Sequence, residues 1–252
     1  MTVLPPSPGH IPFIRSGFQW DVFDAYLFDI DGTLLNCRDA VHYHAFHHAL
    51  FAVCGLETRL EGLPIHGNTD PGILRAALGR AGVDEKTTNS VLPQIIERMC
   101  AEVKRNQPDL APELCPAINE LLTHLERRGR LLCAASGNIE PIGWAKLERA
   151  GLKQRFACGA FSWPLETRVE IFGHGVALAR ERLGERATIC VVGDTPSDIE
   201  AAQELGLAVI ALATGIFRFE QLMACSPDAC LECAQDLIAD SAKSSAEGPL
   251  RT

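Results

Sequence analysis

Short apolar runs that end abruptly at small or polar residues recur along the chain, and they constrain its fold more than any other feature. They are residues 25–30, 130–135, 188–192 and 207–211. Each has the length and composition of a buried β-strand. Segments with helical periodicity alternate with them, at 116–128, 139–150, 168–183 and 197–205. This alternation predicts an α/β fold with a Rossmann-like parallel sheet and helices on both faces.

The stretch after the first run breaks the alternation. Residues 37–111 show helical patterns and loops without convincing strands, which predicts a helical insertion. A chain of 252 residues is long enough for one domain with such an insertion. We therefore expect an N-terminal extension (1–20), an α/β core (21–36 and 112–240), the insertion (37–111) and a flexible tail (241–252) that is rich in Ser, Ala, Gly and charge.

Composition excludes some kinds of partner. The net charge is −9 and no basic run with interleaved aromatics interrupts it, so nucleic acid is not an expected partner. The N-terminus lacks a basic and then apolar signal pattern, and no apolar run approaches the ~20 residues that a membrane helix needs. We expect a cytoplasmic protein with no membrane partner, whose ten cysteines are free thiols. The oligomeric state is left open.

Two carboxylates close the first run. Asp29 and Asp31 flank an apolar residue, and Gly32 lets the backbone turn directly after them. Carboxylates at this spacing repel each other unless a cation or a shared proton compensates. A divalent metal ion is the natural counter-charge, whereas the alternative is an Asp-Gly turn without a ligand.

A second strand end repeats the pattern. Asp194 follows the run at 188–192, and Asp198 lies in a segment that suits the opening of a helix. In parallel sheets ligands bind beyond the carboxyl ends of the strands, where Asp29 and Asp194 meet. Oxygen ligands of this kind favour Mg²⁺. The alternative, a helix cap by Asp198, explains that one residue only.

Phosphate-binding groups are predicted at two further positions. Ser136 ends another run, and its hydroxyl with the N–H groups of Gly137 and Asn138, at an expected helix start, suits a phosphate oxygen. Arg168 opens a later helix, from which a guanidinium can hold both a phosphoryl group and the carboxylate of Asp29. The other cation considered for this place is Lys153.

Together these motifs, in this order and spacing, resemble the haloacid dehalogenase superfamily over about residues 22–238, and most of all its phosphoglycolate-phosphatase-like branch with a helical cap after the first motif. The resemblance implies a Mg²⁺-dependent phosphatase of small phosphorylated metabolites. Asp29 would attack phosphorus, and Asp31 would protonate the leaving oxygen and then activate water. The resemblance also implies metal ligation by the carboxylates of Asp29 and Asp194 and by the backbone carbonyl of Asp31, with Asp198 in support.

The family usually has a Lys where this chain has Arg168, which is one departure from its pattern. A loop in the insertion containing His66, Asn68 and Thr69 resembles the specificity loop of family caps, although a plain turn between helices is the alternative. His44 and His48 lie one helical turn apart, but nothing nearby completes a tetrahedral zinc site, so some histidines within 42–48 are interpreted as facing the substrate instead. Two other functions stay open: a β-phosphoglucomutase-like phosphomutase and a catalytically silent module that binds a phosphorylated ligand.

Overall fold

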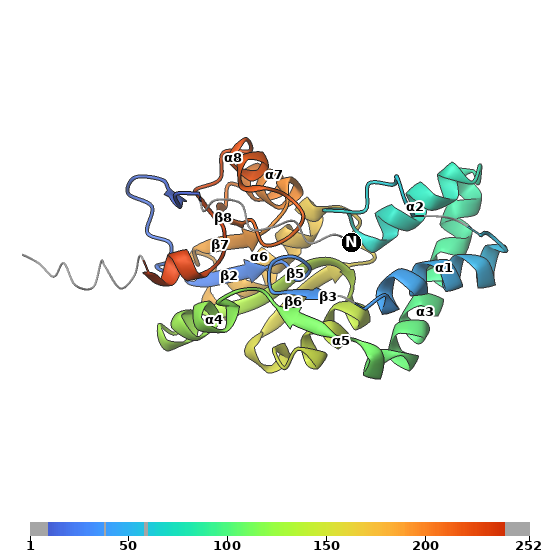
Figure 1. The fold of residues 1–252 in the computed structure, drawn as a ribbon, viewed down its shortest axis with the longest axis horizontal. Coiled ribbons are helices and arrows are strands. Elements are labelled where there is room, and N and C mark those ends of the chain that lie inside the picture. The colour runs from blue at the N-terminus through green and yellow to red at the C-terminus, as the bar shows by residue number, and fades with distance from the viewer. Residues whose placement is uncertain (1–9, 38, 58–59, 240–252) are drawn as a thin grey trace, which may run out of the picture.

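A computed structural model describes residues 10–37, 39–57 and 60–239 of the chain. Its sheet is covered by helices on both faces, and a unit of three helices lies at one end (Figure 1). The flexible tail predicted for residues 241–252 lies outside the described residues.

The main sheet has seven strands in the order β1-β9-β8-β7-β2-β5-β6. All neighbours run parallel except β1, which pairs antiparallel with β9 at the edge. The strands are β1 (Phe13–Ile14), β2 (Ala25–Phe28), β5 (Leu131–Ile139), β6 (Cys158–Ser162), β7 (Ile189–Gly193), β8 (Ala208–Leu212) and β9 (Ala229–Leu231). The predicted Rossmann-like parallel sheet is confirmed, with β1 drawn from the predicted N-terminal extension.

Each central strand is apolar on both sides because helices cover both faces of the sheet. In β2, Tyr26 and Phe28 belong to the core under one face, while Ala25 and Leu27 belong to the core under the other. The covering helices are α4 (Ile118–Arg127) and α5 (Glu140–Arg149) on the first face, and α6 (Arg168–Leu183), α7 (Pro196–Glu204) and α8 (Phe219–Met223) on the second.

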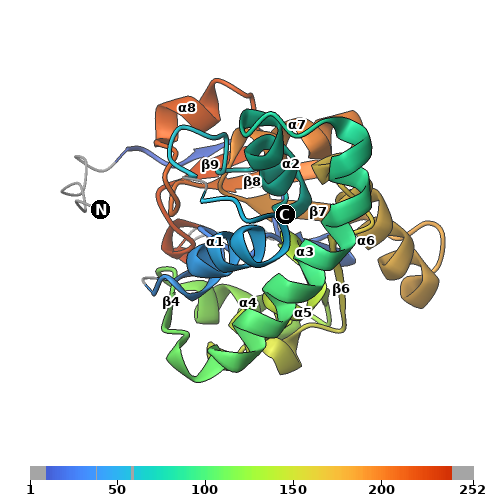
Figure 2. The ribbon, with the colours of Figure 1, turned by 90° about the vertical axis from the view of Figure 1, so that its right-hand side faces the viewer.

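The cap consists of α1 (Val41–Cys54), α2 (Asp70–Arg80) and α3 (Glu85–Arg105), which stand in front of the sheet's end in Figure 2. These helices bury their own apolar core, and Ile142 and Ala145 of α5 join it. The cap is therefore packed onto the core domain through α5.

Two short strands mark the places where the chain leaves and re-enters the core. β3 (Leu35–Cys37) pairs antiparallel with β4 (Pro112–Leu114). The sequence pattern indicated no strand here, because three residues carry too little alternation to reveal one.

The prediction that all ten cysteines are free is wrong for one pair. Cys133 of β5 and Cys158 of β6 form a disulfide, because they face each other across neighbouring strands with their Cα atoms 4.9 Å apart. The other eight are free thiols. None of the described helices has the length and apolar character that crossing a bilayer requires.

Candidate active site

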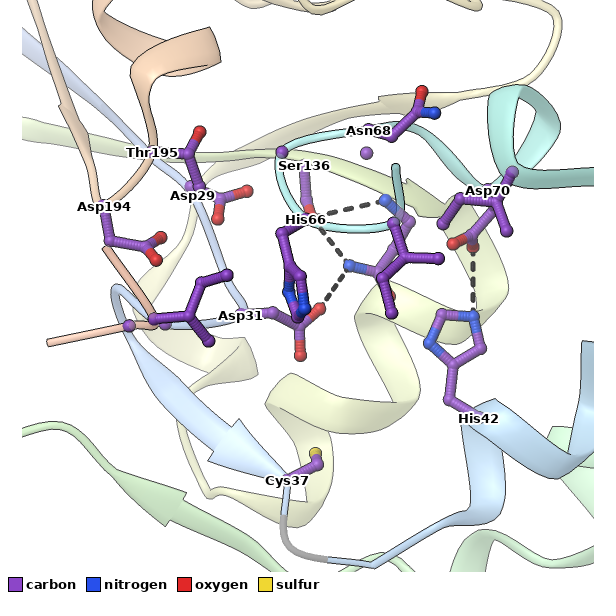
Figure 3. A pocket seen from close by; sticks show the side chains of 18 of the residues that line it. Asp29, Asp31, Cys37, His42, His66, Asn68, Asp70, Ser136, Asp194 and Thr195 are labelled. Carbon is purple, nitrogen blue, oxygen red and sulfur yellow. Dashed lines mark hydrogen bonds and ion pairs between the residues drawn. The ribbon is translucent and has the colours of Figure 1, made fainter. Parts of the chain in front are cut away.

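A cavity of about 350 Å³ lies where the carboxyl ends of β2, β5 and β7 meet the cap. Figure 3 shows Asp29, Asp194 and Asp31 on the core side, with His42 and His66 reaching in from the cap. The sequence separates these residues by up to 165 positions, and the parallel sheet brings them to one edge.

Three buried carboxylates form the deepest part of the site. Oxygens of Asp29, Asp194 and Asp198 all lie within 4.8 Å of one another. Burial, opposed in part by Arg168, raises the pKa of Asp29 to about 7. Burial and the charge of Asp29 raise the pKa of Asp194 well above its usual value. An all-oxygen cluster that repels itself when ionised fits a hard divalent cation such as Mg²⁺.

The backbone around Asp194 leaves room for this cluster. Gly32 has φ +92°, and a side chain there would collide with the carboxylate of Asp194. The hydroxyl of Thr33 donates a hydrogen bond of 2.9 Å to the same carboxylate. The turn after β2 thus holds Asp194 against the cluster.

Arg168 lies between two of these carboxylates. Its Nη1 donates to Oδ1 of Asp29 at 2.9 Å, and its Nε lies 3.1 Å from Oδ1 of Asp198. Thr167 caps α6 in a reciprocal arrangement with Glu170, so the helix begins at Arg168 and aims it inward. Lys153 instead lies on the surface, 3.5 Å from Glu148.

A second polar network surrounds Asp31, whose side chain turns away from the three carboxylates. Lys146, which the sequence analysis missed, donates to both oxygens of Asp31 and to Oδ1 of Asn138. Asn138 in turn donates to Asp31 and to the hydroxyl of Ser136 (Figure 3). The sequence did carry a sign that Lys146 is buried, because it lies four residues after Ile142 and therefore on the buried face of α5.

The expected helix start at Ser136 is wrong. Residues 136–138 continue β5, and α5 begins only at Glu140. The strand continues because Ile139 still pairs with Ser162 of β6 after a local irregularity in the register. The N–H groups of Gly137 and Asn138 are therefore strand amides rather than donors at a helix N-terminus.

The residues of the cap loop have different environments. His66 and Asn68 line the cavity, and burial lowers the pKa of His66. Thr69 does not line it, since its hydroxyl caps α2 and donates to the carbonyl of Glu166. His42 points across the cavity to Asp70, with 3.2 Å between Nε2 and Oδ2 (Figure 3).

Comparison with known proteins agrees with this architecture. The model of the haloacid dehalogenase-like hydrolases matches residues 23–206, and a second HAD-hydrolase-like model matches residues 175–242. The phosphoglycolate phosphatase of Synechococcus elongatus is 29% identical over 217 residues, covering 85% of this chain and 95% of that protein. The probable phosphatase IndB of Dickeya dadantii is 28% identical over 229 residues, covering 84% and 90%.

Solved structures show the same fold. A predicted phosphatase from Clostridium acetobutylicum superposes with a TM-score of 0.66 at 19% identity, covering 88% of this chain and 99% of that one.

Proposed function

Because the chain belongs to the haloacid dehalogenase-like hydrolase family, in its phosphoglycolate-phosphatase-like branch, and is a phosphatase, we propose that it hydrolyses phosphomonoesters of small metabolites with Mg²⁺ through an aspartyl phosphate on Asp29. One observation carries the proposal: Asp29 is buried at the floor of the cavity, ion-paired to Arg168 and clustered with Asp194.

Asp29 is the nucleophile in this mechanism. Burial raises its pKa, and the guanidinium of Arg168 opposes that shift and favours the ionised carboxylate that attack requires. The oxygen of Asp29 forms a bond to phosphorus as the bond to the leaving oxygen breaks. Arg168 is placed to contact the transferring phosphoryl group as well, whose negative charge must be stabilised in the transition state.

Asp31 is the acid/base residue. It delivers a proton to the leaving oxygen in the first step and takes one from the attacking water in the second, which restores the acid form. Burial raises the pKa of Asp31, but the charge and hydrogen bonds of Lys146, with the hydrogen bond of Asn138, outweigh burial and lower it. The resting side chain is therefore ionised and must take up the proton that it delivers. Its side chain is 41% exposed and lines the cavity, which gives it access to both oxygens.

Ser136 is the second phosphate-binding group. Its oxygen accepts hydrogen bonds from the backbone N–H and the side-chain amide of Asn138, at 3.3 and 2.8 Å. With those acceptor positions filled, its own hydrogen is free to be donated into the cavity.

The carboxylates of Asp29 and Asp194, the carbonyl of Asp31 and, in support, Asp198 would hold Mg²⁺. Such a cation, when bound, neutralises the charge of the carboxylates and of the phosphate oxygens.

The substrate is a small phosphorylated metabolite in this proposal, and phosphoglycolate is the first candidate because of the relative from Synechococcus elongatus. His66 and Asn68 line the cavity from the cap and would select the leaving group. Thr69 would contribute indirectly, by fixing the loop against the core.

Phosphate release from a panel of phosphomonoesters, including phosphoglycolate and sugar phosphates, tests the proposal. We expect release that requires Mg²⁺, is lost with EDTA, and falls at least about 10³-fold in Asp29→Asn. Asp84→Asn is a matched control, because Asp84 caps α3 and Asn caps helices equally well.

Two outcomes contradict the proposal. Release that persists in Asp29→Asn would exclude the aspartyl phosphate. Conversion of one sugar phosphate into its isomer, with no release from any ester, would favour a phosphomutase.

A further inference from the structure

We propose that Lys146 is a positioning residue that fixes Asp31, directly and through Asn138, so that one buried ammonium group holds the acid/base residue in place. The inference rests on the proposed function, because it takes the role of Asp31 from it.

The three hydrogens of the Lys146 ammonium are all used within the network. They account for bonds of 2.8 and 2.7 Å to the two oxygens of Asp31 and of 2.7 Å to Oδ1 of Asn138. Lys146 therefore has no donor left for a substrate. Its effect must pass through the two residues that it holds.

Lys146 also decides the orientation of Asn138. Because Lys146 is donor-only, the oxygen of the Asn138 amide must face it, and the amide nitrogen faces the other way. That nitrogen donates to Asp31 at 2.6 Å and to Ser136 at 2.8 Å. The network thereby ties two residues on different strand ends, Asp31 after β2 and Ser136 in β5, to a single helix.

The exposed fractions of the two side chains show that Lys146, rather than Asp31, is the rigid member of the pair. The side chain of Lys146 is 3% exposed and that of Asp31 is 41% exposed. A carboxylate that faces a cavity has several accessible rotamers, and two bonds from a rigid buried donor select one of them.

Stability alone is a weak reason for this arrangement. A buried ion pair often contributes no more than well-packed apolar residues would, because both charges lose hydration. α5 would bury Met in the same stripe without that cost. Holding Asp31 in one geometry is a benefit that an apolar residue does not supply, and a misplacement of about 1 Å can lower a rate about 10²-fold.

The test separates proton delivery from general damage by varying the leaving group. Single-turnover formation of the phosphoenzyme is followed in Lys146→Met with two substrates: the alkyl phosphate hydrolysed fastest in the panel above and p-nitrophenyl phosphate. An aryloxide leaves without a proton, whereas an alkoxide needs one from Asp31.

We expect phosphoryl transfer from the alkyl ester to fall about 10²-fold in Lys146→Met, and transfer from the aryl ester to fall less than about threefold. KM for the alkyl ester should change less than about threefold, and Lys146→Arg should recover at least about tenfold of the lost rate. Lys153→Met removes the same charge from the surface and should leave both rates unchanged.

Equal losses on the two esters, or no loss on either, would overturn the inference, as would identical rates in Lys146→Met and Lys146→Arg. Circular dichroism and thermal melting check that the variants fold. Failure of the proposed function gives a different result, because Asp29→Asn would then still release phosphate from both esters.

Discussion

At the scale of single residues, the proposed nucleophile and its charge partners are more informative than any one motif. Asp29 lies in a buried cluster where carboxylates outnumber cations, and Arg168 is the cation in direct contact with it. Arg168 also reaches Asp198, so its loss would leave two facing carboxylates unpaired. Its proposed role in catalysis and its contribution to stability are therefore linked.

We predict that Arg168→Met lowers kcat/KM about 10²- to 10³-fold, because a donor to the transferring phosphoryl group is lost. Breaking a buried pair also destabilises by about 3–5 kcal/mol, which a denaturant titration would measure. Steady-state assays of Arg168→Met and Lys153→Met give the comparison. Greater loss in Lys153→Met would show that the other cation occupies the catalytic position.

At the scale of elements, the N-terminal half of α2 binds the cap to the core through a set of contacts that we call the clasp. Thr69 and Arg75 both bind Glu166, which lies two residues before Arg168. The guanidinium of Arg75 donates to both carboxylate oxygens of Glu166, at 2.5 and 2.8 Å. The N–H of Ile139 also donates to Asp70 at 2.8 Å. The loop that carries His66 is thus anchored directly beside Arg168.

We predict that Arg75→Met loosens this clasp and lowers kcat/KM about three- to tenfold, mainly through KM. A partly exposed bidentate pair is worth about 1 kcal/mol, which is roughly fivefold in an equilibrium constant. Steady-state kinetics with the best ester of the panel provides the measurement.

Arg105→Met is the matched control, because Arg105 pairs with Glu102 inside α3 and does not cross to the core. Equal effects of the two substitutions would mean that cap stability, rather than the clasp, controls binding.

At the scale of the whole molecule, the acidic cluster links folding to pH. The pKa of Asp29 is about 7 in the folded chain and 3.8 in a model peptide. At a pH between these two values, Asp29 keeps a proton in the folded chain that it has released in the unfolded chain. The free energy of unfolding of the metal-free protein therefore falls as pH rises through this window.

Because Mg²⁺ bound at this cluster would compete with that proton, we predict that saturating Mg²⁺ raises Tm by about 5 °C or more at about pH 8 and by much less at about pH 5. Thermal melts with Mg²⁺ and with EDTA at the two pH values make the measurement. Asp194→Asn should abolish the Mg²⁺ effect. A shift of equal size at both pH values would argue against binding at this cluster.

The sequence by itself determined the class of the sheet and the edge at which chemistry occurs. Buried strands are recognisable as short apolar runs, and a parallel sheet places the residues that follow them, such as Asp29 and Asp194, at one edge. These are local patterns, which can be recognised in a single sequence without knowledge of the tertiary structure.

Only the tertiary structure decided which side chains from different elements meet. Lys146 contacts Asp31 across 115 positions, Cys133 is bonded to Cys158, and Arg75 reaches Glu166 from the cap. Such contacts depend on helix rotation, strand register and domain packing. No spacing along the chain encodes them, because each is the joint result of every element that packs between its two partners.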